Sequence, residues 1–274
     1  MKKIILLLTW FLSSAVVGVA QITIAPTNLF IDHNNRFGTY LVINNSDQNQ
    51  EISIDFLFAY SQIDENGNRT TVSSDTALEK EHSIASAIRA FPQNFILTPN
   101  TRQVVRIRVN PPNDFTDGTY WARIKTLATP ESRALEITTE DNVSAQVGIR
   151  LEQITGLYYK KGQVSTGIVV DSIRPSVDDQ LLTVLTDYKR TGNSPFLGTI
   201  TASLIDNAEN TITQNFNATT LYFDGTHKME MDLSEIPSGE YTVKVNFETR
   251  RSDISQDDLV QMEPVTATTT VTIP

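Results

Sequence analysis

The 274-residue chain contains no cysteine and only three histidines. Without cysteine, no disulfide can stabilise a domain and no thiol can serve as a nucleophile or a metal ligand. The three histidines, His33, His82 and His227, lie far apart and show no His-x-x-x-His spacing, so the pattern indicates no metal site. The sequence also lacks a Gly-x-Ser-x-Gly element and a phosphate-binding Gly-rich loop. We therefore expect a protein that is not an enzyme and that uses no cofactor and no metal.

Positive charge is scarce as well. The chain has 22 Lys and Arg against 32 Asp and Glu, a formal net charge of −10. Such a balance argues against nucleic acid as a partner. The acidic pairs Asp178-Asp179 and Asp257-Asp258 are interpreted as solvated turns, and no small-molecule substrate is expected.

Long hydrophobic runs are absent except at the N-terminus. A basic start leads into the apolar run Ile4–Leu12, and Gly18 and Ala20 then occupy the −3 and −1 positions of a cleavage site. This order is typical of a secretory signal peptide, and the run is short for a membrane span. We expect residues 1–20 to be a signal peptide and the protein to be exported.

The rest of the sequence consists of short alternating runs separated by turn residues. In residues 52–56 apolar and polar residues alternate, and Asn66-Gly67 is a strong hairpin signal. Only residues 75–90 are rich in helix formers, and they predict one or two helical turns. Short strands with turn signals at intervals of roughly 8–12 residues predict an all-β fold of sandwiches.

A Gly-x-Tyr sequence opens a predicted strand twice. Gly118-Thr119-Tyr120 follows one polar loop, and Gly239-Glu240-Tyr241 follows another that ends in Pro237. Both resemble the tyrosine corner of immunoglobulin-like sandwiches, in which the phenol hydrogen-bonds to the preceding loop. Two copies predict two tandem immunoglobulin-like β-sandwiches, which we assign to residues 21–157 and 158–274.

Several stretches, taken in their order, resemble the PapD-like periplasmic chaperones of pilus assembly. They are GTYLVINNSDQ (38–48), Phe91-Pro92 followed by FILTPNTRQVVRIRV (95–109), Asp117–Trp121, and Asn193–Phe196. The resemblance covers most of residues 22–160. It implies two sandwiches set at an angle and a non-enzymatic periplasmic carrier. Its expected partners are secreted subunits with an incomplete sandwich and an outer-membrane usher.

The resemblance further implies that the chaperone lends an edge strand to the subunit. Residues 142–151 alternate as a strand would, and five apolar side chains would share one face: Val143, Ala145, Val147, Ile149 and Leu151. This face fits strand lending, and it equally fits the core of the protein's own first domain. Both interpretations stay open at this point.

The family anchors the carboxylate of its subunit with two basic residues, which by approximate register correspond here to Asn28 and Ile154. Neither is basic, although a buried carboxylate needs charged donors. Arg150 and Lys160 are the candidate substitutes. The resemblance also implies that Arg106 and Asp117 help to fix the angle between the domains, with Tyr120 and Tyr241 as structural residues.

Two other classes of function remain as alternatives. One is an exported structural or adhesive protein built from tandem sandwiches. The other is a glycan-binding module, for which Trp121 and Tyr158-Tyr159 are the available aromatics. Since we expect Trp121 to be buried in a core or between the domains, the chaperone hypothesis leads.

Overall fold

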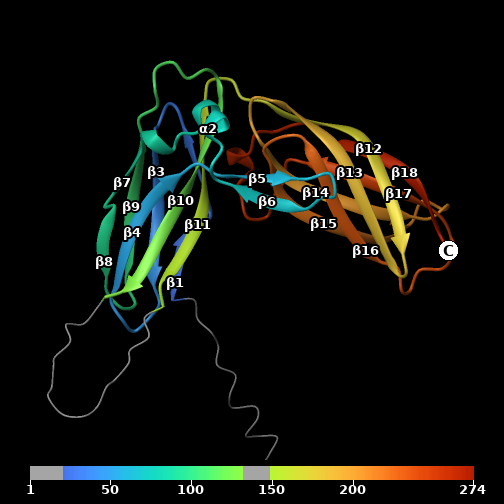
Figure 1. Ribbon diagram of the computed structural model, residues 1–274, viewed down its shortest axis with the longest axis horizontal. Helices are drawn as coiled ribbons and strands as arrows, with labels where there is room; N and C mark the ends of the chain where they lie inside the picture. The colour runs from blue at the N-terminus through green and yellow to red at the C-terminus, as the bar shows by residue number, and fades with distance from the viewer. Residues whose placement is uncertain (1–20, 132–148) are drawn as a thin grey trace, which may run out of the picture.

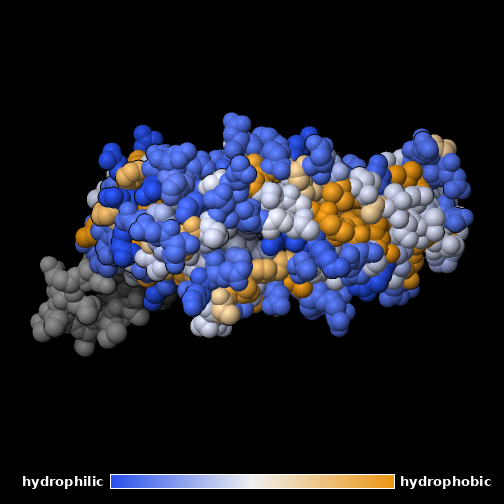
Figure 2. All heavy atoms as spheres, turned by 90° about the horizontal axis from the view of Figure 1, so that it is seen from above, coloured by the Kyte–Doolittle hydropathy of each residue, from blue (hydrophilic) through white to orange (hydrophobic). Residues whose placement is uncertain are grey.

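A computed structural model describes residues 21–131 and 149–274, which form two β-sandwich domains (Figure 1). The two domains meet at one end, and their strands run in different directions in Figure 1. The predicted all-β fold with two tandem sandwiches is confirmed. The surface seen in Figure 2 is largely hydrophilic, and an apolar patch lies on the half formed by the second domain.

The first domain packs a four-stranded sheet, β1-β3-β9-β7, against a five-stranded sheet, β2-β11-β10-β4-β8. The strands are β1 (Ile22–Ala25), β2 (Asn28–Asp32), β3 (Phe37–Asn44), β4 (Gln50–Leu57), β7 (Ile88–Phe91), β8 (Asn94–Leu97), β9 (Arg102–Val109), β10 (Gly118–Pro130) and β11 (Leu151–Lys161). The chain passes from one sheet to the other between β1 and β2. The peptide bonds before Pro26 and Pro92 are cis.

The alternation read from the sequence fixes which side chains form the core of this domain. On β9, Val105, Ile107 and Val109 are fully buried, while the arginines between them are exposed. Burial of one such aliphatic side chain contributes about 1.5–3 kcal/mol. Side chains of a strand alternate between its two faces, so the apolar face of β9 packs against the core of the domain and the other face meets solvent.

The second domain packs β12-β13-β16 against β15-β14-β17-β18. Its strands are β12 (Thr166–Asp178), β13 (Leu181–Gly192), β14 (Phe196–Ile205), β15 (Thr211–Leu221), β16 (Gly225–Asp232), β17 (Gly239–Glu248) and β18 (Val265–Ile273). Val243, Val245 and Phe247 of β17 are buried in its core. A short 3-10 helix, η2 (Gln256–Asp258), precedes β18.

Both predicted tyrosine corners are present. The Tyr120 hydroxyl donates to the carbonyl of Thr116 at 3.2 Å, and the Tyr241 hydroxyl donates to the carbonyl of Pro237 at 2.9 Å. In each case the acceptor lies four residues upstream. The phenol therefore ties the loop to the strand that follows it.

The predicted helical turns lie between β4 and β7. They are α2 (Thr76–His82) and the 3-10 helix η1 (Ala85–Ala87). Asp75 caps α2, because its carboxylate accepts from the backbone N–H groups of Ala77 and Leu78. Within residues 21–131 and 149–274, no helix has the length and apolarity needed to cross a membrane.

A hairpin of the first domain reaches the second domain. It consists of β5 (Tyr60–Ile63), β6 (Arg69–Val72) and the turn between them, and we call it the arm. Asp64 shapes the turn by accepting from the backbone N–H groups of Asn66 and Asn68. The hairpin predicted from Asn66-Gly67 is thus confirmed, and Figure 1 shows it lying along the second domain.

The junction between the domains lies after β11. This strand stays paired with β10 up to Lys161, opposite Gly118, whereas the predicted boundary after residue 157 would fall within it. The turn at Gly162 follows the strand and precedes β12, and the exact domain bounds stay a prediction. Gly162 has a φ of 62°, and a Cβ there would collide with the carboxylate of Asp117, so glycine is required.

Candidate functional site

The strand β11 has a free edge over half of its length. On one side it pairs with β10 along all of its residues, from Leu151 to Lys161. On the other side, parallel pairing with β2 covers only Gly156 to Lys160. Among residues 21–131 and 149–274, the backbone of Leu151–Thr155 therefore has no strand neighbour on that side. The Gln153 side chain donates there to the carbonyl of Ile22 at 3.1 Å. We call this half of β11 the open edge.

The side chains of the open edge divide between the two faces of the sheet. Leu151 packs against the core of the first domain, while Ile154 is 55% exposed on the opposite face. Ile149 lies just before the strand and is 61% exposed. Val143, Ala145 and Val147 lie outside the described residues, so the five-residue lending face stays a prediction.

Ile154 belongs to the solvent-facing side of the five-stranded sheet, and this face extends from β11 across β10, β4 and β8. Ile154 lies opposite Lys125, which lies opposite Asp55 on β4. Further along, a groove of about 440 Å³ opens over β4, β8 and β10, and its lining includes Leu127 and Ile96. Ile96 is 55% exposed. The open edge therefore adjoins a sheet face that carries exposed apolar side chains.

The two candidate anchor residues lie at opposite ends of β11. Arg150 precedes the strand and Lys160 lies near its end, which separates them by roughly 30 Å at the rise of a strand. They are therefore separate candidates, and the carboxylate anchor stays a prediction. Arg150 is exposed, and no hydrogen bond or ion pair of its side chain is found in the described part of the chain. Lys160 is only 15% exposed, with its Nζ 3.4 Å from the Asp32 carboxylate and 3.3 Å from the carbonyl of Asp258.

Of the two residues expected to fix the domain angle, Asp117 lies at the junction. Its carboxylate accepts from the backbone N–H of Gln163 at 2.9 Å, and its carbonyl accepts from the Asn193 side chain at 3.1 Å. Arg106 is exposed on the outer face of β9, in the other sheet. No ion pair between Arg106 and Asp117 occurs among the residues that the structure describes.

The domains meet through a group of buried, mostly aromatic side chains, which we call the junction cluster. The first domain contributes Phe58, Tyr60, Trp121 and Tyr158, and the second contributes Leu197, Tyr222, Ile254 and Leu259. Tyr158 and Tyr222 share a hydroxyl–hydroxyl hydrogen bond of 2.8 Å, and the rings of Trp121 and Tyr222 lie 4.8 Å apart.

The burial of this cluster bears on the glycan-binding alternative. Trp121 is 2% exposed, Tyr158 1% and Tyr159 0%. The expected burial of Trp121 is confirmed, at the domain interface. None of the three aromatics is available to stack against a sugar.

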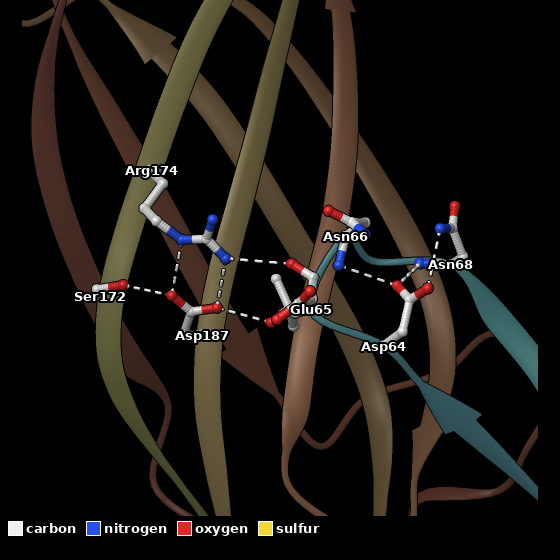
Figure 3. A network of polar contacts seen from close by, with 8 residues as sticks. Asp64, Glu65, Asn66, Asn68, Ser172, Arg174 and Asp187 are labelled. Carbon is white, nitrogen blue, oxygen red and sulfur yellow. Dashed lines mark hydrogen bonds and ion pairs between the residues drawn. The ribbon is translucent and has the colours of Figure 1, made fainter.

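The arm makes a second, polar contact between the domains. Arg174 on β12 holds Asp187 on β13 with two hydrogen bonds of 2.8 and 2.9 Å, and its Nη2 donates to the carbonyl of Glu65 in the arm at 3.2 Å (Figure 3). The hydrogen bonds from Arg174 have the largest effect on the Asp187 carboxyl, and those from Ser172 and Thr226 add to it. Together they hold its pKa well below the usual range.

Under the arm lies a buried histidine. Arg69 of β6 donates to the hydroxyl of Thr219, and His227 on β16 is 4% exposed. Burial, followed by the charge of Arg69, lowers the pKa of His227 to about 4. No group of three or more His, Asp or Glu side chains that could hold a metal occurs in residues 21–131 and 149–274.

No protein-family model and no curated protein sequence matches the chain. Some solved structures have a similar backbone arrangement. The YadV chaperone shares 10% identity at a TM-score of 0.45, over 91% of this chain and 100% of that one. The CsuC–CsuE chaperone–tip adhesion subunit complex of Acinetobacter baumannii shares 9% identity at a TM-score of 0.45, over 90% and 98%.

A third similar structure is the Salmonella enterica SafA pilin in complex with the SafB chaperone, with 10% identity and a TM-score of 0.43, over 92% and 98% of the two chains. At such identities and TM-scores, no residue role is carried over from these structures.

Proposed function

We propose that the protein is a non-enzymatic chaperone that binds secreted subunits along the open edge of β11. The observation that carries the proposal is the one-sided pairing of Leu151–Thr155. A strand edge with unpaired backbone groups is a template for another strand. A subunit that lacks a strand would complete its own sheet by pairing with this edge.

The sheet face beside the open edge supports the same function. Ile154 and Ile96 are each 55% exposed, and Leu127 lies between them on β10. Apolar side chains of a subunit would cover this face as the strands pair. Since Lys160 is already held by Asp32 at the junction, binding in this proposal rests on strand pairing and apolar contact, with Arg150 as an exposed cation beside the edge.

The compartment and the partners belong to the same proposal. Similar structures are described as chaperones, one of them as the periplasmic chaperone SfaE, and two are complexes with a pilin or a tip subunit. Together with the predicted signal peptide, this supports a periplasmic protein that caps pilus-like subunits. An outer-membrane usher is the proposed acceptor of the complex.

The test begins with the tagged protein purified from its own cell envelope. The expected result is a stoichiometric subunit that aggregates when it is separated from the chaperone. Hydrogen exchange on the complex should then show new amide protection in Leu151–Thr155. Ile154→Asp should lower subunit binding at least tenfold without changing stability, because the side chain is exposed.

The matched control is Ile212→Asp on β15 of the second domain, where the native side chain is 43% exposed. This variant should bind the subunit as the native protein does. A client-free monomer would contradict the proposal. Full subunit binding by Ile154→Asp, or unchanged exchange in Leu151–Thr155, would place the binding surface elsewhere.

A further inference from the structure

A cavity of about 260 Å³ lies between the two domains, at the end of β11 opposite to the open edge. Its walls come from the end of α2, from the loop and strand around Gly118, and from the turn between β13 and β14. Gly118 pairs with Lys161, ten residues away from Leu151 along β11. The cavity is therefore separate from the proposed strand-binding site.

Two buried N–H groups of residues that line this cavity have no acceptor. They are Nε1 of Trp121 and Nε of Arg190. Another nitrogen of the same guanidinium, Nη1, donates to the carbonyls of Gly192 at 2.8 Å and Ser194 at 3.1 Å, which fixes the position of the Arg190 side chain. A buried donor without a partner is unfavourable until an acceptor reaches it.

The cavity is lined by one arginine and by two carboxylates that have other partners. Glu81 lies 3.7 Å from Nε2 of His82, and Asp117 accepts from the backbone N–H of Gln163 at 2.9 Å. Arg190 forms no ion pair with any carboxylate in the described residues, and Asp224 accepts only from its backbone N–H, at 2.8 Å. His82 stacks on Trp121 with ring centres 4.8 Å apart. Burial lowers its pKa, the Glu81 carboxylate opposes this shift, and the charge of Arg190 adds to it.

We propose that this cavity binds a small organic carboxylate, with the Arg190 guanidinium as its counter-charge and Trp121 Nε1 as a second donor. Charge-assisted hydrogen bonds from N–H groups to a carboxylate are the strong ones, and both donors are held in place by their surroundings. Ligand pockets commonly measure roughly 300–1,000 Å³, so a cavity slightly below this range fits a ligand of few carbons rather than an extended chain.

Such a ligand would touch both domains, because Trp121 belongs to the first and Arg190 to the second. Binding to the folded state alone raises stability according to the ligand concentration relative to its Kd. Ligand binding in this cavity does not depend on the chaperone function proposed above, because the cavity is separate from the open edge.

The test uses the indole N–H signal of Trp121. Trp10 and Trp121 are the only tryptophans in the sequence, so the ¹H–¹⁵N indole spectrum has at most two signals, and Trp121→Phe identifies the relevant one. Acetate, propionate and benzoate are titrated into the protein alongside the matched amides. We expect a saturable shift of the Trp121 signal with at least one carboxylate and none with its amide.

Variants then assign the two donors. Arg190→Gln should weaken carboxylate binding at least tenfold, and Trp121→Phe, which keeps a ring in the junction cluster, should weaken it several-fold in calorimetry. Arg250→Gln is the control, because this side chain is 74% exposed and does not line the cavity, and binding should be unchanged.

Three results would overturn the proposal. They are the absence of any saturable shift, equal binding of amides and carboxylates, and native affinity in both Arg190→Gln and Trp121→Phe. Because Trp121→Phe leaves the Arg190 contacts intact, the test holds even if Arg190→Gln fails to fold. Binding of a peptide with a free C-terminus, with no small carboxylate bound, would also contradict the proposed ligand class.

Discussion

Two of the contacts between the domains differ in chemistry. The junction cluster is a buried group of mainly aromatic side chains, with one hydroxyl pair between Tyr158 and Tyr222. The arm is held instead by polar hydrogen bonds, from Arg174 to the carbonyl of Glu65 and from Arg69 to the hydroxyl of Thr219, and it covers the buried His227. We therefore expect the first contact to contribute more to stability and the second to depend more on pH.

The largest effect is expected at the junction cluster. Tyr158→Ala removes a side chain that is 1% exposed and that stacks on Phe30 at 5.2 Å, so it should cost about 3–5 kcal/mol of unfolding free energy. Urea unfolding, followed by the fluorescence of Trp121, measures this loss.

Tyr158→Phe separates packing from hydrogen bonding at the same position. It should cost about 1–2 kcal/mol, because Tyr222 loses its hydrogen bond to the Tyr158 hydroxyl in a buried site. A loss below about 1 kcal/mol for Tyr158→Ala would show that the cluster does not hold the domains together.

An intermediate effect is expected from the histidine beneath the arm. The pKa of His227 is lowered to about 4 in the folded protein, whereas an unfolded histidine titrates near 6.5. Between these values the unfolded state binds more protons, so stability must fall as the pH drops from about 6.5 to 4. We expect a loss of about 2–3 kcal/mol over that range.

Two variants sharpen the assignment of this pH dependence. His227→Leu should flatten the stability curve above pH 4, and Arg69→Gln should shift its midpoint upward by removing a nearby positive charge. Unfolding free energies measured from pH 7 to pH 4 test both. An unchanged slope in His227→Leu would assign the acid sensitivity to another group.

The smallest effect concerns the Arg174–Asp187 pair. Because the pKa of Asp187 is depressed in the folded state, its contribution is present above the unfolded value near 3.9 and is lost as the pH falls below it. Asp187→Asn should cost about 1–2 kcal/mol at pH 7, a figure reduced for the partial exposure of the pair. The difference from the native protein should shrink toward acidic pH.

A control for this variant lies on β12. Asp171→Asn removes the carboxylate of an exposed pair with Lys189, whose side chains are 42% and 61% exposed, and should change stability by less than about 0.5 kcal/mol. Equal losses in the two variants would mean that contact with the arm adds nothing to the Arg174–Asp187 pair.

The strands, the helical turns and the tyrosine corners could be predicted because each rests on local patterns. Val105, Ile107 and Val109 alternate with polar residues, and Tyr120 and Tyr241 each bond to a carbonyl four residues away. The candidate site could be predicted only in part. Alternation assigned Leu151 to a face, but whether β2 covers the whole of β11 depends on where the chain crosses between the sheets.

The roles expected for Arg106 and Lys160 stay predictions, because they rest on a family resemblance and depend on contacts between distant residues. In the structure Lys160 contacts Asp258 of the second domain, and Arg106 faces outward from β9. Sequence spacing carries no information about such contacts, because they join residues about a hundred positions apart.

The amino-acid sequence by itself determined two sandwiches without disulfides, since alternation and turn chemistry are encoded within a few residues. Only the tertiary structure decided which half of β11 is open, that the arm lies on the second domain, and that Trp121 and Arg190 line one cavity with unpaired donors. The physical reason is that burial and pairing between distant strands depend on how complete domains pack, and a local pattern does not specify that.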